Sequence, residues 1–183
     1  MEEIKEIEIK PSAGQSALFY GLVLSVAMIF THLILFLADY HKSTNGFIIM
    51  LIVMTAGIVW ASTDYRNKKW KGFISYGKAV KIGFLTVLFA SIILACYTMI
   101  FHKYIDDSEV VRLRTVAKTE IQKMEDRDQM TKEDASKAAI WSDYMYSPVS
   151  FGIMSIFIYS FFGILIALIT SIFIKKEESV RLQ

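Results

Sequence analysis

The sequence has 183 residues, of which 54% are apolar and 21% are charged, with a net charge of +2 and a single cysteine. One cysteine allows no intrachain disulfide, which excludes a small secreted domain held together by disulfides. The net charge by itself indicates no class of partner, and nucleic-acid binding has no support beyond one basic loop. The apolar fraction is above that of an ordinary globular domain.

Residues 1–16 precede the first apolar run. Residues 1–10 contain four Glu and two Lys, and the run that follows is too long for the apolar core of a signal peptide. We therefore expect no cleaved signal peptide. We predict an N-terminal segment over residues 1–16 that lies in the cytoplasm.

Four long apolar runs follow, and they cover residues 17–38, 47–63, 80–101 and 149–174. Each is close to or longer than the roughly 17–25 residues with which a helix crosses a bilayer. Their only Lys, Arg, Asp or Glu is Lys81, the second residue of the third run, whereas the helices of a soluble bundle carry charged outer faces. The runs predict an all-α, polytopic membrane protein. Its first three transmembrane helices lie within residues 17–101, its fourth spans residues 149–174, and residues 175–183 form a tail.

The first run contains the only histidine found in any of the four, His32. Asp39 follows seven residues later, so two helical turns would place both side chains on similar faces. A histidine beside a carboxylate suits a proton relay or a metal. The alternative is a His32 that hydrogen-bonds a carbonyl or a serine of a neighbouring helix. The sequence has no tight spacing typical of metal ligands, so we predict neither a metal nor a cofactor.

The loop between the second and third runs is strongly basic, with six Lys or Arg within residues 66–81 and one acid, Asp64, just before them. Short loops rich in Lys and Arg lie on the cytoplasmic side of a membrane. We therefore predict both termini in the cytoplasm and residues 102–148 outside. Four of these side chains suit the phosphates of anionic lipids, and they are Arg66, Lys69, Lys71 and Lys78. The alternative is that the basic loop does no more than set the orientation of the chain.

Small residues recur along the predicted spans at helical spacing. Close backbone approach through small residues is a main route by which helices associate in lipid. We expect the packing faces to include Ala17, Gly21, Gly57, Gly83, Gly163 and Ala167.

The long loop over residues 102–148 carries two amphipathic patterns. Apolar residues recur three and four apart over residues 110–124, which predicts a helix of about four turns. Thr131 and Asp134 then form a variant of the capping box at the start of a second helix, and Ser147 and Pro148 end it. The loop is predicted to be a helical hairpin. It either packs on itself and on the bilayer surface, or offers a docking surface to another protein.

A short motif joins the basic loop to the third span. It consists of Tyr65 and Arg66, a charged gap, and the residues Gly-Phe-Ile-Ser-Tyr-Gly at 72–77. With the four-span layout, the motif resembles the signature of a Bacteroidota membrane family named domain of unknown function 4199, over residues 14–176. The resemblance implies this architecture and the bacterial inner membrane, and it implies no reaction. It also suggests a partner protein, since members of that family are often encoded beside a family 2 glycosyltransferase.

The same junction has a physical explanation. Gly72 and Gly77 are expected to let the chain turn tightly into the third span, and Ser75 is a plausible N-cap for it. Lys78 and Lys81 are placed to reach lipid head groups.

No motif of a known enzyme class occurs in the sequence, and we predict no catalytic residues. The function expected is that of a non-catalytic accessory or scaffold subunit for a membrane enzyme that acts on lipid-linked substrates. Its partners would be membrane lipids and another membrane protein or a second copy of itself. The alternative function is a small transporter or lipid-handling protein that works as a dimer.

Overall fold

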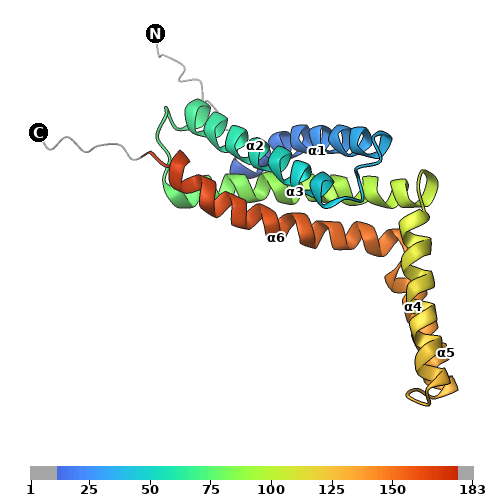
Figure 1. Ribbon diagram of the computed structural model, residues 1–183. Coiled ribbons are helices and arrows are strands. Elements are labelled where there is room, and N and C mark those ends of the chain that lie inside the picture. The colour runs from blue at the N-terminus through green and yellow to red at the C-terminus, as the bar shows by residue number, and fades with distance from the viewer. Residues whose placement is uncertain (1–11, 177–183) are drawn as a thin grey trace, which may run out of the picture. The chain divides into compact units, whose positions relative to one another are not determined.

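The computed structural model describes residues 12–176, and these residues form six α-helices. The helices are α1 (Ala13–Leu37), α2 (Thr44–Lys69), α3 (Tyr76–Tyr104), α4 (Ser108–Asp126), α5 (Lys132–Met145) and α6 (Pro148–Ile174), as Figure 1 shows. Within this range the only β-type pairing is an isolated antiparallel bridge between Ile74 and Lys176. The predicted all-α class with a hairpin between the third and fourth spans is confirmed. Most of the predicted N-terminal segment and tail lies outside the described residues.

Four of the described helices, α1, α2, α3 and α6, are long and apolar enough to cross a membrane. All four are longer than the apolar runs that predicted them, and α2 and α3 are extended the most. Helix α2 runs from Thr44 to Lys69 rather than from Phe47 to Thr63, and α3 runs from Tyr76 to Tyr104 rather than from Val80 to Phe101. Residues that include polar and charged ones extend these two spans at both ends, as expected for a helix that leaves the hydrocarbon region.

The start of α1 has a local explanation. Ser12 is the N-cap residue, and its hydroxyl accepts a hydrogen bond from the Gln15 N–H at 3.3 Å. The Gln15 side chain in turn accepts from the Ser12 N–H at 2.9 Å. This reciprocal capping box satisfies two backbone donors that the first helical turn leaves unpaired.

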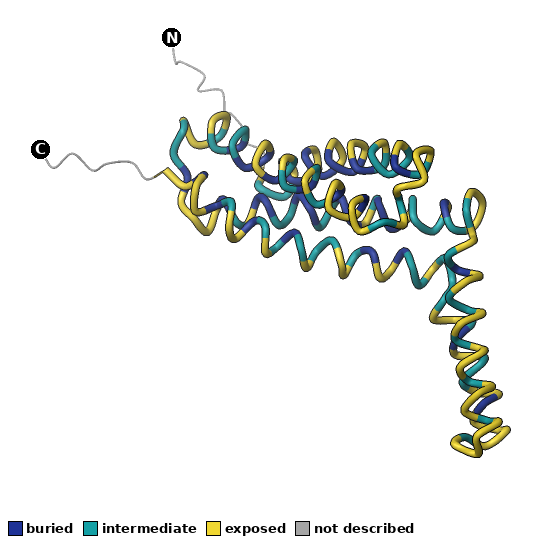
Figure 2. Tube along the Cα trace, viewed as in Figure 1, coloured by how far each residue is buried: buried dark blue, intermediate teal, exposed yellow. Residues whose placement is uncertain are grey.

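The chain divides into two compact units. Unit 1 contains residues up to Ser91 and from Tyr159 onward, and unit 2 contains residues Ile92–Ile158. In unit 1 the buried residues lie along the inner faces of the helices, coloured dark blue in Figure 2. One cluster of its core consists of Ala17, Tyr20, Ala61, Tyr65, Ile74, Ala79, Ile82 and Ile174.

Small residues bring the helices of unit 1 into close contact. A Cβ atom added to Gly21 of α1 would lie 2.8 Å from the Phe89 Cβ and 2.9 Å from the Thr86 carbonyl oxygen of α3. The same addition at Gly163 of α6 would lie 2.5 Å from Val87 of α3. These two positions require glycine because a side chain has no space there.

The other small residues expected at packing faces also lie at contacts inside unit 1. A Cβ on Gly57 would meet Leu24 of α1 at 2.5 Å, and one on Gly83 would meet Ala167 of α6 at 3.2 Å. Ala17 and Ala167 are both fully buried. These small residues of α1, α2, α3 and α6 thus lie at close contacts between helices of a single chain.

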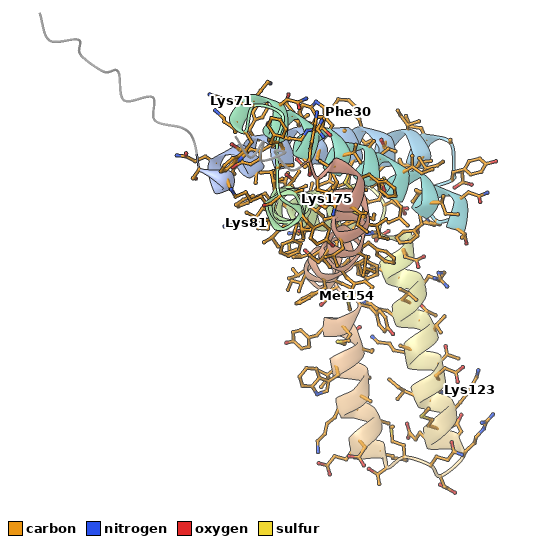
Figure 3. The ribbon with its side chains drawn as sticks, turned by 90° about the vertical axis from the view of Figure 1, so that its left-hand side faces the viewer. Phe30, Lys71, Lys81, Lys123, Met154 and Lys175 are labelled. Carbon is orange, nitrogen blue, oxygen red and sulfur yellow. The ribbon has the colours of Figure 1, made fainter. Side chains whose placement is uncertain are left out.

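In unit 2, α4 and α5 lie side by side. Thr131 is the N-cap of α5, and its hydroxyl accepts from the Asp134 N–H at 3.2 Å. The same hydroxyl donates to the Asp134 carboxylate at 2.8 Å, so Asp134 supports the cap without reaching the backbone of Thr131. Figure 3 shows Lys123 on α4, where its ammonium pairs with Glu120 at 2.7 Å.

The end of α5 is held by side chains from both neighbouring helices. Arg114 of α4 donates to the Tyr146 carbonyl at 2.6 Å and to the Asp143 carbonyl at 3.3 Å. The Ser150 hydroxyl of α6 donates to the Tyr144 carbonyl at 2.6 Å. These donors satisfy carbonyl groups that the last turn of a helix leaves unpaired. They hold the end of α5 in place just before α6 begins at Pro148.

Candidate functional site

The candidate site is one end of unit 1, where α2 ends, α3 begins and α6 ends; we call it the basic end. Helix α2 ends at Lys69, and the Trp70 and Gly72 N–H groups both donate to the Arg66 carbonyl at 3.1 Å. The chain then reverses through left-handed conformations, with φ of +49° at Lys71 and +89° at Gly72. Glycine adopts this conformation at no steric cost, so Gly72 makes the turn that the sequence predicted.

Gly77, the other glycine predicted to form the turn, lies within a helix instead. Gly77 lies in the first turn of α3 and is not among the described residues with a positive φ. A Cβ atom added there would have no neighbour within 4 Å. Gly77 is therefore not needed for the turn, because α3 has already begun. Ser75 immediately precedes α3, and its carbonyl accepts the Ala79 N–H at 3.1 Å.

Three contacts fasten the basic end to the last turns of α6. The Arg66 guanidinium donates from Nη1 to the Ile174 carbonyl at 2.9 Å. Ile74 and Lys176 exchange two backbone hydrogen bonds of 2.9 and 3.0 Å. The Tyr76 hydroxyl donates to the Leu168 carbonyl at 3.1 Å. A positive group beside the last carbonyls of a helix is also favoured by the helix dipole, so Arg66 has a structural role.

Aromatic rings hold other cations of the basic end. The Lys78 ammonium lies 3.4 Å from the centre of the Trp70 ring, and that of Lys176 lies 5.5 Å from the centre of the Phe73 ring. Cation–π contacts of this kind orient an ammonium while leaving its N–H donors available. Figure 3 shows the side chains of Lys71, Lys81 and Lys175 at the same helix ends. The basic end thus contains several cations, of which Lys78 and Lys176 lie over aromatic rings.

The predicted lipid-phosphate residues all belong to this end, but their surroundings differ. Arg66 is held by α6, and Lys78 lies over Trp70. Lys71 is exposed and Lys69 is half-buried. The ammonium groups of Lys69, Lys71 and Lys78 keep donors that an anion at this end would accept. The four residues remain a predicted site.

Sequence reasoning missed a polar group beside the basic end. The Tyr20 hydroxyl of α1 donates to the Asp64 Oδ2 atom at 2.7 Å, and the Lys68 ammonium lies 3.0 Å from the same oxygen. The Asp64 side chain is 21% exposed. The sequence prediction assigned Asp64 to the loop because the apolar run stops at Thr63. Tyr65 lies four residues after Ala61, which is helical spacing, and both side chains are buried. This spacing is the signal that would have placed Asp64 in the helix.

A shallow groove begins at this carboxylate and follows α2. Its volume is about 780 Å³. The described residues that line it are Ile52, Thr55, Ala56, Val59, Trp60, Thr63, Asp64 and Asn67. They recur three and four apart, so they form one face of α2. The face is mainly apolar from Ile52 to Trp60 and polar from Thr63 to Asn67.

The structure does not support the geometry assumed for His32 and Asp39. Helix α1 ends at Leu37, and Asp39 has a φ of +58° and is exposed. Helical periodicity therefore does not extend to Asp39, and the two residues do not share a helix face. The His32 ring lies edge-on to the His41 ring, 6.0 Å away. Within residues 12–176, no group of three or more His, Cys, Asp or Glu side chains is placed to hold a metal ion.

Four long apolar helices with polar groups gathered at their ends define the class of this molecule, a multi-pass α-helical membrane protein. The chain belongs to the family described as "Protein of unknown function (DUF4199)", whose model matches residues 19–176. This match confirms the family that the motif at residues 65–77 indicated. No curated protein and no solved structure matches the chain. The inner-membrane location and the cytoplasmic termini remain predictions.

Proposed function

We propose that this protein is a non-catalytic accessory subunit for a membrane enzyme that acts on lipid-linked substrates. The observation that carries the proposal is the construction of the basic end. Arg66 and Tyr76 fasten it to α6, and Trp70 orients Lys78. A set of cations at the end of a span, of which Arg66 and Lys78 are held by neighbouring groups, suits the phosphate groups that link lipids to their head groups.

The aromatic residues of the basic end fit the same position. Trp70 and Tyr76 are both partly exposed, and such amphipathic rings are enriched at the boundary between hydrocarbon and head groups. Lys69 and Lys71 would then lie at the level of lipid phosphates. The basic end would hold the phosphate of a lipid-linked substrate next to the partner enzyme.

The role of an accessory subunit is supported by how the spans use their surfaces. The small-residue faces are occupied within unit 1, since Gly21 and Gly163 both contact α3. Helix α6 is the most apolar of the four spans and the least buried. Its outward side chains in unit 1 include Phe161, Ile169 and Phe173. We propose this face as the contact for the partner, for which a family 2 glycosyltransferase is the expected candidate.

The proposal is tested by purification of the native complex in mild detergent after crosslinking in the membrane. We expect a membrane enzyme to be recovered in a fixed ratio with this chain, and a bulky polar substitution, Ile169→Gln, to reduce the recovery. The matched control is Ile34→Gln on the exposed side of α1. Recovery of a lone dimer with bound lipid would contradict the proposal and would support the second function.

That second function, a small lipid-handling protein, is favoured by one observation. The groove on α2 combines an apolar surface with a carboxylate at its end. This arrangement suits an amphiphilic ligand, whether or not the protein has a partner.

A further inference from the structure

The groove along α2 lies in the wall of a membrane-spanning unit, and the contacts described so far do not explain its polar end. Its apolar part is closed on one side by Trp60, whose ring packs edge-on against Tyr20 with centroids 5.2 Å apart. Its volume of about 780 Å³ is within the range of roughly 300–1,000 Å³ that is usual for ligand pockets. We infer that this groove binds one phospholipid whose zwitterionic head group carries a primary ammonium.

The length of the groove fits an acyl chain of one leaflet. From Ile52 to Thr63 the helix rises by about 16 Å, at about 1.5 Å per residue. One half of the hydrocarbon core of a bilayer is about 15 Å thick. The apolar part therefore ends where the acyl chain of a lipid ends, and the polar residues from Thr63 to Asn67 begin at the level of the head group.

The charges at the polar end select the head group. Asp64 and Lys68 form a pair 3.0 Å apart along one turn of α2, so they present a negative and a positive charge side by side. A zwitterionic head group matches this pair when its ammonium lies at Asp64 and its phosphate lies at Lys68. The carboxylate has room for the ammonium, since the described contacts of Tyr20 and Lys68 both use Oδ2.

Other head groups fit less well. An anionic head group without an amine could place its phosphate at Lys68, but it would bring a negative charge close to Asp64 and offer this carboxylate no ammonium. A quaternary ammonium has no N–H, so it donates no hydrogen bond to Asp64 or to the groove hydroxyls. A primary ammonium makes charge-assisted hydrogen bonds, which are roughly twice as strong as neutral ones.

A purely structural role does not require the charge of Asp64. The bond from Tyr20 would be satisfied by a neutral acceptor, and Lys68 is 68% exposed, so it needs no partner for solvation. An ionised carboxylate at the border of a span has a desolvation cost and marks a functional site by default. The ammonium of a lipid explains why the charge is present. This inference does not depend on the accessory function, because none of the cations assigned to lipid-linked phosphate lines the groove.

The test is lipid retention by the full-length protein, reconstituted with equal amounts of phosphatidylethanolamine, phosphatidylcholine and phosphatidylglycerol of the same acyl chains. Native mass spectrometry then measures the lipid that stays bound. We expect phosphatidylethanolamine to be retained about tenfold over phosphatidylcholine, the ratio that one charge-assisted hydrogen bond supplies. Ala56→Phe, which fills the groove from an exposed position, should abolish this retention. Ala27→Phe, an exposed alanine of α1 that is outside the groove, should leave it unchanged.

Asp64→Asn tests recognition of the lipid head group separately from recognition of the acyl chain. It keeps an acceptor for Tyr20, and it should lower retention of phosphatidylethanolamine to the level of phosphatidylcholine. If this variant does not fold, the pair Ala56→Phe and Ala27→Phe decides the question alone. Equal retention of the three lipids, or retention unaffected by Ala56→Phe, would overturn the inference. A preference for phosphatidylethanolamine over phosphatidylcholine that is lost on Lys69→Ala and Lys71→Ala, yet kept in Ala56→Phe, would place this recognition at the basic end and would also overturn the inference.

Discussion

An arginine fastens a helix end in each of the two units, and the comparison shows how differently the units are built. Arg66 in unit 1 donates to the Ile174 carbonyl, 108 positions along the chain. Arg114 in unit 2 donates to the Tyr146 carbonyl, 32 positions along the chain. Around Arg114 further ion pairs lie at the surface, such as Lys118 with Asp143 at 2.9 Å. Unit 1 instead depends on small residues in close contact, and its few polar contacts are concentrated at the basic end.

This difference teaches where to look for function. In a hairpin that carries many charges, one more ion pair indicates little, because surface pairs each contribute about 0–1 kcal/mol. A charged side chain within an apolar span has a free-energy cost of desolvation, so its presence there indicates a function. Asp64 is such a charge, and the cations of the basic end surround the same helix terminus. The following predictions test this contrast.

The largest effect is expected at the close contacts of unit 1. Gly21→Ala places a methyl group against the backbone of Thr86, and overpacking of this kind costs about 1–3 kcal/mol. Gly77→Ala is the matched control, since it has open space and gains about 1 kcal/mol of helix propensity. Thermal unfolding in detergent should show Gly21→Ala with a lower midpoint and Gly77→Ala with an equal or higher one. Equal midpoints for both variants would show that α1 and α3 are less closely packed.

The two arginine caps are expected to differ in strength. Arg66→Gln leaves the Ile174 carbonyl without its charged donor at the edge of the apolar unit, which costs about 1–3 kcal/mol. Arg114→Gln should cost less, because water replaces the lost donor at the exposed end of α5. Hydrogen exchange followed by mass spectrometry should show faster exchange over residues 170–176 in the first variant and over residues 142–147 in the second. A larger loss of stability in Arg114→Gln would contradict the contrast between the units.

A smaller effect is expected where an uncharged donor is lost and the carboxylate keeps a second partner, Lys68. Tyr20→Phe deletes the donor to Asp64 and should destabilise the protein by about 1 kcal/mol. Lys118→Ala in the hairpin removes a partly exposed ion pair and should cost about half of that or less. Chemical denaturation of both variants compares them directly. A loss in Lys118→Ala that equals the loss in Tyr20→Phe would show that the hairpin pair is more than a surface contact.

The smallest effect concerns the pH dependence of the hairpin. The Lys123 ammonium, which hydrogen-bonds Glu120, holds the pKa of the Glu120 carboxyl below its ordinary value. A lowered pKa means that this pair stabilises the folded state above the ordinary pKa of Glu, and that the contribution is lost as the pH falls through the folded value. Lys123→Ala should return the pKa of Glu120 toward its ordinary value in an NMR titration. An unchanged titration of Glu120 would show that the pair does not persist in solution.

Much of the fold follows from the sequence because hydropathy dominates in a membrane chain. The four spans, the hairpin and its Thr131 cap were all predicted from local patterns. A tight turn at Gly72 was predicted as well, because glycine adopts unusual backbone conformations freely. The family was indicated by the motif at residues 65–77.

The site was less predictable, because its contacts join distant segments. The Tyr20–Asp64 bond connects residues 44 positions apart, and no local pattern pairs them. The apolar run that ended at Thr63 concealed that α2 continues through Asp64. The pairing of His32 with Asp39 was wrong for a related reason, since the helix ends at Leu37 and periodicity stops there.

The central claim is that the basic end binds lipid phosphate, and one measurement tests it most directly. Anionic phospholipid that co-purifies with the protein is quantified for wild type, for Lys69→Ala with Lys71→Ala, and for Lys132→Ala with Lys137→Ala, which removes the same charge from the hairpin. We predict that enrichment of anionic lipid is lost in the first double variant and kept in the second. Unchanged enrichment in the first double variant, or an equal loss in both, would contradict the claim.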